Sequence, residues 1–376
     1  MARNRVIYQS EALYVSEDID STATIKHEQL ERVQSANYSF TINRQDINQY
    51  GQLARIDSIV LDPPTASLDF SYYLTDGFNE RSLGFYVQNP TNTGEIQFAS
   101  GHMVNNSGKN FFISTVAEGS DAIGISGVES VIGLGNGFLS DYTLDLAVGS
   151  LPTVSVTMEC ANIVADKDIG GLTGVGGVAT GISGISNPAV SLTDGTPKTD
   201  PIELSLANTG ESDITALRPG DVTIDIATLD GLTLTDISGT GTTDSIHIQS
   251  ASLSIPLSRS ELQRLGTRFP YSRSVDFPVN ATLSINGIVN EMTTGNLANI
   301  IDDNSTKTVT LTIKDTDRSD RMIYTLKGCK IDSESFSSSI GSNKTVDLTF
   351  STQIGGIGDT TNGVFVSGAN TDTIFS

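Results

Sequence analysis

The stretch Val33-Gln-Ser-Ala-Asn-Tyr-Ser-Phe-Thr-Ile-Asn-Arg44 returns later in the chain as Ile248-Gln-Ser-Ala-Ser-Leu-Ser-Ile-Pro-Leu-Ser-Arg259. The match extends without a gap over residues 33–70 and 248–285, and glycines, prolines and apolar positions stay in step. The repeat pairs include Arg44 with Arg259, Gly51 with Gly266, and Pro63 with Pro278. Two fused copies of one unit predict a chain that behaves as a covalent dimer, which indicates an assembly subunit before it indicates an enzyme.

Within each copy the apolar residues recur at every second position. In the first copy these residues are Ala36, Tyr38, Phe40 and Ile42, and in the second they are Ala251, Leu253, Ile255 and Leu257. This period predicts strands with one buried and one wet face.

A short helix is expected after each of these strands. Ser258 with Glu261 forms a capping box, and Asn43 with Asp46 is its weaker counterpart. Gly51 and Gly266 follow, at the place of a left-handed helix stop. The predicted fold is therefore mainly β: two tandem units, each a β-sandwich or partial barrel with a short helix.

The repeat and the composition divide the chain into four segments. We expect a first unit at 1–164, a Gly/Ser/Thr-rich connector at 165–215, a second unit at 216–356 and a flexible C-terminal tail at 357–376. The first copy is the longer one, and its extra residues are expected to form long loops at 75–108 and 120–148. Long loops usually serve contacts with other molecules.

The composition excludes several classes of function. A net charge of −22 over 376 residues disfavours binding to nucleic acid or to an anionic membrane surface. The two cysteines make neither a disulfide framework nor a metal site, and the three histidines lie far apart in sequence. No stretch approaches a membrane span, and the N-terminus lacks the apolar run of a secretion signal. We therefore expect no catalytic residues, no metal, no cofactor and no membrane association.

Four aspartates lie inside predicted strands, although this residue is disfavoured there. They are Asp69, Asp145, Asp225 and Asp347, each between apolar neighbours at a position facing water. One interpretation is a solvated sheet face that discourages random edge pairing. The other is a strand face that lines an acidic passage.

Two longer phrases resemble the tail tube (major tail) proteins of tailed bacteriophages. They are Arg32-Val-Gln-Ser-Ala-Asn-Tyr-Ser-Phe-Thr-Ile-Asn-Arg-Gln-Asp-Ile-Asn-Gln-Tyr-Gly51 and Ser67-Leu-Asp-Phe-Ser-Tyr-Tyr-Leu-Thr-Asp-Gly-Phe-Asn-Glu80. The resemblance is good over the first half of the chain and reaches the second half mainly through the internal repeat. It implies six-fold rings whose sheets join into one inner barrel, stacked into a hollow tube through which DNA is ejected.

A duplicated chain would by that resemblance need three copies per ring, with pseudo-six-fold symmetry. The implied partners are further copies of the chain, the tail terminator, the tape-measure protein and the baseplate or tip proteins, with DNA passing through unbound. The implied location is the virion tail, reached from the host cytoplasm during assembly. One of the loops at 75–108 and 120–148 would contact the neighbouring ring, and its deletion would leave folded protein that cannot polymerise.

Three other classes of function remain open from the residues. An extracellular β-rich adhesin or carbohydrate-binding protein suits the composition, although it predicts a secretion signal and clustered surface aromatics. A decoration or baseplate protein of a virion could use the same unit. An enzyme is the least favoured class, because no grouping of nucleophile, base and orienting residue appears.

Overall fold

The computed structural model describes residues 11–17, 27–89, 96–104, 108–116, 121–122, 130–167, 169, 171–173, 181–192, 194–200, 202–207, 217, 222–227, 246–267, 269–289, 306–315 and 319–370. The fold is mainly β, as the sequence predicted, and most strands belong to one antiparallel network. Among the described residues no helix is long and apolar enough to cross a membrane.

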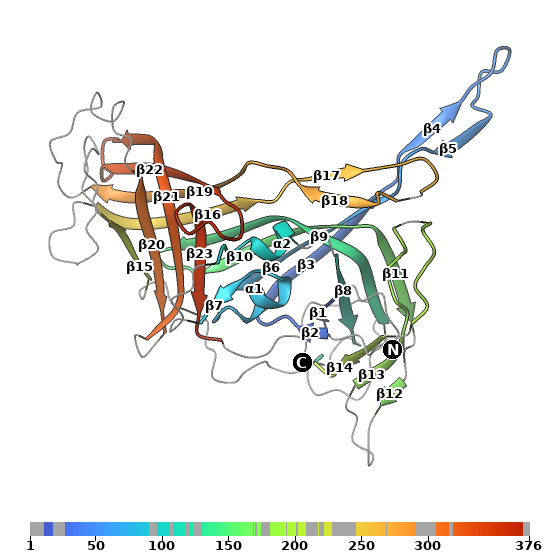
Figure 1. Cartoon of the computed structure of the whole chain (residues 1–376), viewed down its shortest axis with the longest axis horizontal. Helices are drawn as coiled ribbons and strands as arrows, with labels where there is room; N and C mark the ends of the chain where they lie inside the picture. Colours follow the sequence, from blue (N-terminus) through green and yellow to red (C-terminus); the bar gives the residue numbers. More distant parts are fainter. Residues whose placement is uncertain are drawn as a thin grey trace.

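One sheet runs through both copies of the repeat, and we call it the shared sheet (Figure 1). Its strands follow the order β3-β6-β10-β9-β16-β19-β22-β21, so the first copy supplies the first half and the second copy the rest. The strands are β3 (Val33–Thr41), β6 (Thr65–Tyr73), β10 (Thr153–Cys160), β9 (Ser130–Ala147), β16 (Ile246–Pro256), β19 (Val279–Val289), β22 (Thr345–Ile354) and β21 (Asp320–Ser337). Buried and more exposed residues alternate along β6, β10, β19 and β22, in keeping with a two-residue period.

The two copies repeat the same pairing down to a matching irregularity. In the first copy β9 skips Ser140 where it pairs with β10, and in the second β21 skips Asp332 at the equivalent point against β22. An extra residue of this kind is a β-bulge, which bends its strand. A shared bulge confirms that the repeated sequence is a repeated structure.

Each unit has a second layer of strands, and the bent strands β9 and β21 run from one layer into the other. In the first unit this layer holds β2 (His27–Gln29), β1 (Glu11–Glu17), β8 (Lys109–Thr115) and β11 (Asn162–Lys167). In the second it holds β15 (Val222–Ala227), β20 (Lys307–Lys314), β23 (Gly363–Gly368) and the short β7 (Val87–Gln88). Side chains from the shared sheet and from these layers form one continuous hydrophobic core.

The helices predicted after the first strand of each copy are wrong. Those residues form β-hairpins, β4–β5 (Arg44–Ile47 and Asp57–Val60) and β17–β18 (Arg259–Leu262 and Ser272–Val275). Gly51 and Gly266 have positive φ angles of 88° and 89°, but they lie in the hairpin ends. A capping pattern spans only a few residues, so a strand partner further along the chain overrides it.

The long loops predicted in the first copy are also wrong. Segment 75–108 contains α1 (Phe78–Leu83) and α2 (Ser100–Val104), and its residues Leu83, Phe85 and Phe98 are buried in the core. Most of 120–148 belongs to β9, which lies in the middle of the shared sheet. The described residues of these two segments therefore contribute to the core of the first unit.

The described parts of the connector and of the tail include strands, which their composition did not predict. Within 165–215 the structure places a small sheet of β12 (Gly171–Thr173), β13 (Gly181–Ile185) and β14 (Ile202–Ser205). Its apolar residues pack with Tyr14 and Phe112 of the first unit. Within 357–376, β23 is mostly buried and pairs with β21, so this part is not a loose tail.

Candidate assembly surface

The junction between the two units is a continuous strand ladder. β9 pairs with β16 over Ala147 to Asp141 and Ser250 to Pro256, and the ladder sets Leu144 opposite Leu253. Both leucines are 1 % exposed. On the wet side Ser252 donates a hydrogen bond of 2.6 Å to Asp145. The strand at the edge of the first unit, β9, thus pairs with the strand at the edge of the second unit, β16, in the way that strands of two separate molecules can pair.

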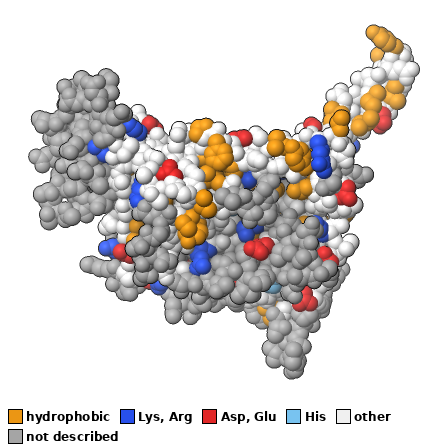
Figure 2. Space-filling model, in the orientation of Figure 1, with side chains coloured by type: hydrophobic (Ala, Val, Ile, Leu, Met, Phe, Trp, Pro, Cys, Tyr) orange, Lys and Arg blue, Asp and Glu red, His pale blue; other side chains and the backbone are white. Residues whose placement is uncertain are grey.

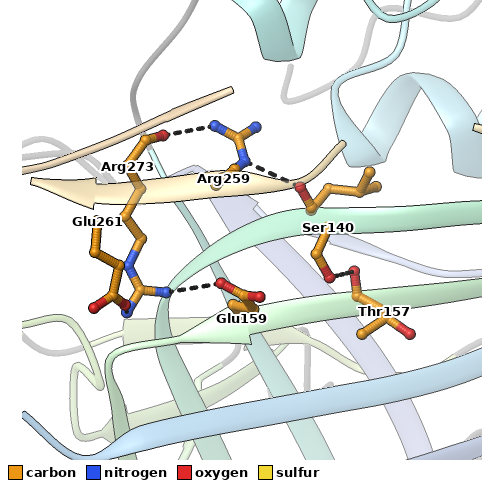
Figure 3. Close-up of polar contacts among 7 residues, drawn as sticks. Ser140, Thr157, Glu159, Arg259, Glu261 and Arg273 are labelled. Carbon is orange, nitrogen blue, oxygen red and sulfur yellow. Dashed lines mark hydrogen bonds and ion pairs between the residues drawn. The ribbon is translucent and has the colours of Figure 1, made fainter. Parts of the chain in front are cut away.

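Hairpin β17–β18 of the second unit continues beyond the end of β16 and contacts β9 and β10 of the first unit (Figure 3). The Nε of Arg259 donates to the carbonyl of Leu139 at 3.0 Å. The guanidinium of Arg273, 4 % exposed, lies 2.7 Å from Glu261 and 3.6 Å from Glu159. Both guanidinium groups also lie over the ring of Phe138, 5.2 and 5.8 Å from its centroid. Cation–π contacts, the hydrogen bond from Arg259 and the ion pair between Arg273 and Glu159 therefore connect a second-unit hairpin to first-unit strands.

A buried polar cluster links the units inside the core. Tyr72 donates to the carboxyl of Glu80 at 2.9 Å, and Tyr142 approaches the same oxygen at 3.4 Å. The hydroxyl of Tyr142 also lies 3.0 Å from that of Tyr324, which belongs to the second unit. Burial raises the pKa of Glu80 to about 7, although the hydrogen bond from Tyr72 acts in the opposite direction. No local sequence pattern brings these four residues together, so the cluster could not be predicted from the sequence.

The outer strand β3 has the same residue pattern as β16 but a different exposure. Tyr38 and Phe40 are 45 % and 63 % exposed, whereas their counterparts Leu253 and Ile255 are 1 % and 0 % exposed. The reason is position: β16 lies between β9 and β19, while β3 pairs only with β6 among the described strands. An apolar row that one copy buries is thus presented to solvent by the other.

The opposite end of the shared sheet is the C-terminal half of β21, residues 330–337. Among the described strands it pairs there only with β22, since β23 contacts β21 further back, at 322–327. The residues of β21 that occupy the places of Leu144 and Tyr142 are Phe336 and Glu334. The shared sheet therefore ends on one side in β3, the repeat counterpart of β16, and on the other side in β21, the repeat counterpart of β9.

Hairpin β4–β5 is the exposed counterpart of β17–β18. It projects from the body of the molecule and carries a line of hydrophobic side chains (Figure 2). At its end Tyr50 and Leu53 are fully exposed. Arg44 belongs to a strand that is exposed throughout, unlike its repeat partner Arg259. Pro63 and Pro278 both lie between the hairpin and the strand that follows it, β6 or β19.

Exposed apolar residues also occur at the other end of the strands. The turns after β9 and β21 carry Val148, 67 % exposed, and Ile340, fully exposed. Each precedes a glycine with positive φ, Gly149 or Gly341. Both units thus present exposed apolar residues in the turns at both ends of their strands. Surface residues scattered singly would not recur in this way.

Three of the four aspartates predicted to share a wet face do share one. Asp69, Asp145 and Asp347 are exposed on the same side of the shared sheet, where they accept hydrogen bonds from Thr157, Ser252 and Asn286. Asp225 does not join them, because its strand β15 pairs with β20 in the second layer. Its side chain lies outside the described residues. The positions around the three aspartates are mainly Ser, Thr and Asn.

No family of known proteins matches the sequence, and no curated protein matches it. Among solved structures, the chain is similar to one from the anti-feeding prophage baseplate, determined by cryo-EM with six-fold symmetrisation. The similarity has a TM-score of 0.29 and 11 % sequence identity, and it covers 44 % of this chain and 98 % of that chain.

Proposed function

We propose that the chain is a structural virion protein, the ring-forming subunit of a hollow phage tail tube. The observation that carries the proposal is the shared sheet: two equivalent units already joined edge to edge, with the complementary edges β3 and β21 at its two ends. An open sheet with such edges pairs with other chains, and closing it into a ring leaves no edge free.

The contact between copies is head to tail, because the two edges differ. Head-to-tail contacts generate closed rings when the rotation closes and filaments when it does not. The resemblance noted in the sequence implies six units, and so three chains, per ring. Tail terminator, tape-measure and baseplate or tip proteins are the further partners that a tube of this kind requires.

The wet face of the shared sheet is the surface we assign to the lumen. Its opposite face is buried in the core, so only the polar face is available to line a channel. Carboxylates such as Asp69 and Asp145 repel phosphates by about 1 kcal/mol per close pair in water. Salt limits this repulsion to about 8–10 Å. DNA would therefore slide along the centre of the tube without binding to the wall.

Stacking of rings would use the apolar tips at the two ends of the strands. Tyr50, Leu53 and Leu265 lie at the hairpin ends, and Val148 and Ile340 lie at the opposite turns. The two ends differ, so stacking is also head to tail and continues along the axis. Hairpin β4–β5 thus replaces the loops at 75–108 and 120–148 as the segment proposed to reach the next ring.

Negative-stain electron microscopy of the purified full chain at rising concentration tests the proposal. Rings or hollow tubes support it, and tubes with a regular axial repeat support stacking as well. Discrete monomers at every concentration would refute it and favour the alternative of an extracellular adhesin or carbohydrate-binding protein. Binding to a glycan array would then be the measurement that supports that alternative.

A further inference from the structure

We infer that β21 of one copy pairs with β3 of the next copy in the register that β9 makes with β16 inside the chain. This inference rests on the proposed ring and specifies its contact residue by residue. The template is the internal junction, where β9 of the first unit pairs with β16 of the second unit and each residue pair is defined. The shared bulge of β9 and β21 fixes which residues of β21 replace those of β9.

Transferring the register places four pairs across the contact. Ser337 of one copy lies opposite Asn37 of the next, Phe336 opposite Tyr38, Ser335 opposite Ser39, and Glu334 opposite Phe40. The pairs alternate between the wet face and the core face, as the internal pairs do.

The chemistry of two pairs fits their faces, and the exception is Glu334, which brings a carboxylate to the core face opposite Phe40. Phe336 and Tyr38 stand where Leu144 and Leu253 meet in the internal junction, and an aromatic pair directly opposite across antiparallel strands is stabilising. Phe336 is already half-buried against the core, while Tyr38 is 45 % exposed. On the wet face Ser337 and Asn37 replace Asp145 and Ser252, and they too can share a hydrogen bond.

The register also specifies where hairpin β4–β5 would contact the neighbouring chain, next to its strand β21. If this hairpin lies on the neighbour as β17–β18 lies on the first unit, Arg44 takes the place of Arg259 and faces the carbonyl of Ile331. Lys330 then stands in the place of Phe138, and Asp46 in the place of Glu261. Lys330 would then face Arg44 where Phe138 faces Arg259, so this contact does not reproduce the arginine–aromatic stacking of the internal junction.

Disulfide trapping of the full chain tests the register. Residues directly opposite in an antiparallel ladder have Cα atoms about 4.5–5.5 Å apart, within the span of a disulfide. The in-register variant, Asn37→Cys with Ser337→Cys, places one thiol on each edge, on the wet face that an oxidant can reach. The native Cys160 and Cys329 are buried, which keeps them out of the reaction.

Two further variants serve as matched controls. The out-of-register variant, Asn37→Cys with Ser335→Cys, is displaced by two residues, at about 7–8 Å. Asp145→Cys with Ser252→Cys reproduces the in-register geometry inside one chain and should form an intramolecular disulfide. Each single cysteine variant reports background cross-linking between whole rings.

After mild oxidation of assembled protein, the in-register variant is expected to run as covalent dimers and trimers on a non-reducing gel. The out-of-register variant should stay mainly monomeric. Rings in the microscope with no such ladder, or with a stronger ladder from the out-of-register variant, would overturn the register and leave the ring intact. Absence of both rings and ladder would overturn the register together with the proposed function.

Discussion

Tyr142 of the first unit and Tyr324 of the second meet in the core with their hydroxyl oxygens 3.0 Å apart. Repeat symmetry does not produce this contact, because the counterpart of Tyr142 is Glu334 and the counterpart of Tyr324 is Ile132. The two copies have therefore diverged at the positions that join them inside one chain. Divergence of this kind makes the internal junction distinct from any junction between chains.

The first prediction concerns Glu80, whose carboxyl group lies 3.4 Å from the hydroxyl of Tyr142. Its pKa is raised to about 7 by burial, so the folded protein keeps a proton that the unfolded chain loses above about pH 4.5. Stability from this group is complete below pH 4.5, falls as the pH rises to 7 and stays low above it. A shift of this size corresponds to about 3 kcal/mol.

Glu80→Gln keeps an oxygen for Tyr72 and Tyr142 but does not titrate. We expect the variant to be more stable than the wild type at pH 8 and nearly equal at pH 4.5. Urea unfolding at several pH values measures this difference. A gap between the two proteins that does not change with pH would contradict the assignment.

The second prediction compares two arginines with carboxylate partners at similar distances. Arg273 is buried and lies 2.7 Å from Glu261, whereas Arg55 is exposed and lies 3.0 Å from Asp46. Removing a buried partner is costly, but Glu261 is about one-third exposed, so solvent lessens the effect. We expect Arg273→Ala to lower the free energy of unfolding by about 2 kcal/mol, and Arg55→Ala by less than about 0.5 kcal/mol. Equal losses in urea unfolding would contradict the role given to the β17–β18 hairpin.

The sequence predicted the elements that depend on local alternation and on the repeat. β3 and β16 lie where a two-residue apolar period places them, and the repeat relates β6 to β19, so the two copies pair their strands alike. The wet face that holds Asp69, Asp145 and Asp347 followed from the same period. These features need no knowledge of distant partners.

The features that failed depend on partners far away in the chain. Asn43 and Asp46 form a helix-capping pattern, yet pairing with β5 makes residues 44–47 a strand. The extra length of the first copy predicted a loop at 75–108, yet Phe85 and Phe98 stack with ring centroids 4.2 Å apart in the core. β23 follows a glycine- and threonine-rich stretch and is held by β21. Long-range pairing overrides local propensity at each of these places.

The third prediction separates assembly from folding at one repeat position. Tyr38 and Leu253 occupy equivalent places on β3 and β16, but only Leu253 is buried. Leu253→Ala should lower the free energy of unfolding by about 2–5 kcal/mol. Tyr38→Ser should change it by less than about 0.5 kcal/mol and abolish ring formation. Calorimetry with light scattering measures both, and rings of Tyr38→Ser at wild-type concentration would argue against β3 as an assembly edge.

The fourth prediction concerns the projecting hairpin. Tyr50→Ser combined with Leu53→Ser removes two fully exposed apolar side chains without touching the core. We expect single rings that no longer stack, seen as rings without tubes by negative stain. Deleting 75–108 should instead unfold the chain, because this segment contributes buried residues to the core. Tubes of normal length from the double variant would show that another segment makes the axial contact.

The last prediction concerns the polar face assigned to the lumen. Replacing Asp69, Asp145 and Asp347 with lysine reverses three charges on one face of the shared sheet. If this face lines the channel, tubes of the variant should retain short duplex DNA, and added salt should release it as counterions compete for the phosphates. The matched control carries lysine in place of Glu11, Asp121 and Glu203, exposed acidic residues outside the shared sheet. Co-sedimentation of DNA with the tubes measures retention at low and high salt. Because the two triple variants have the same net charge, stronger retention by the first locates the effect on the wet face, and equal retention by both would remove the argument that this face meets DNA.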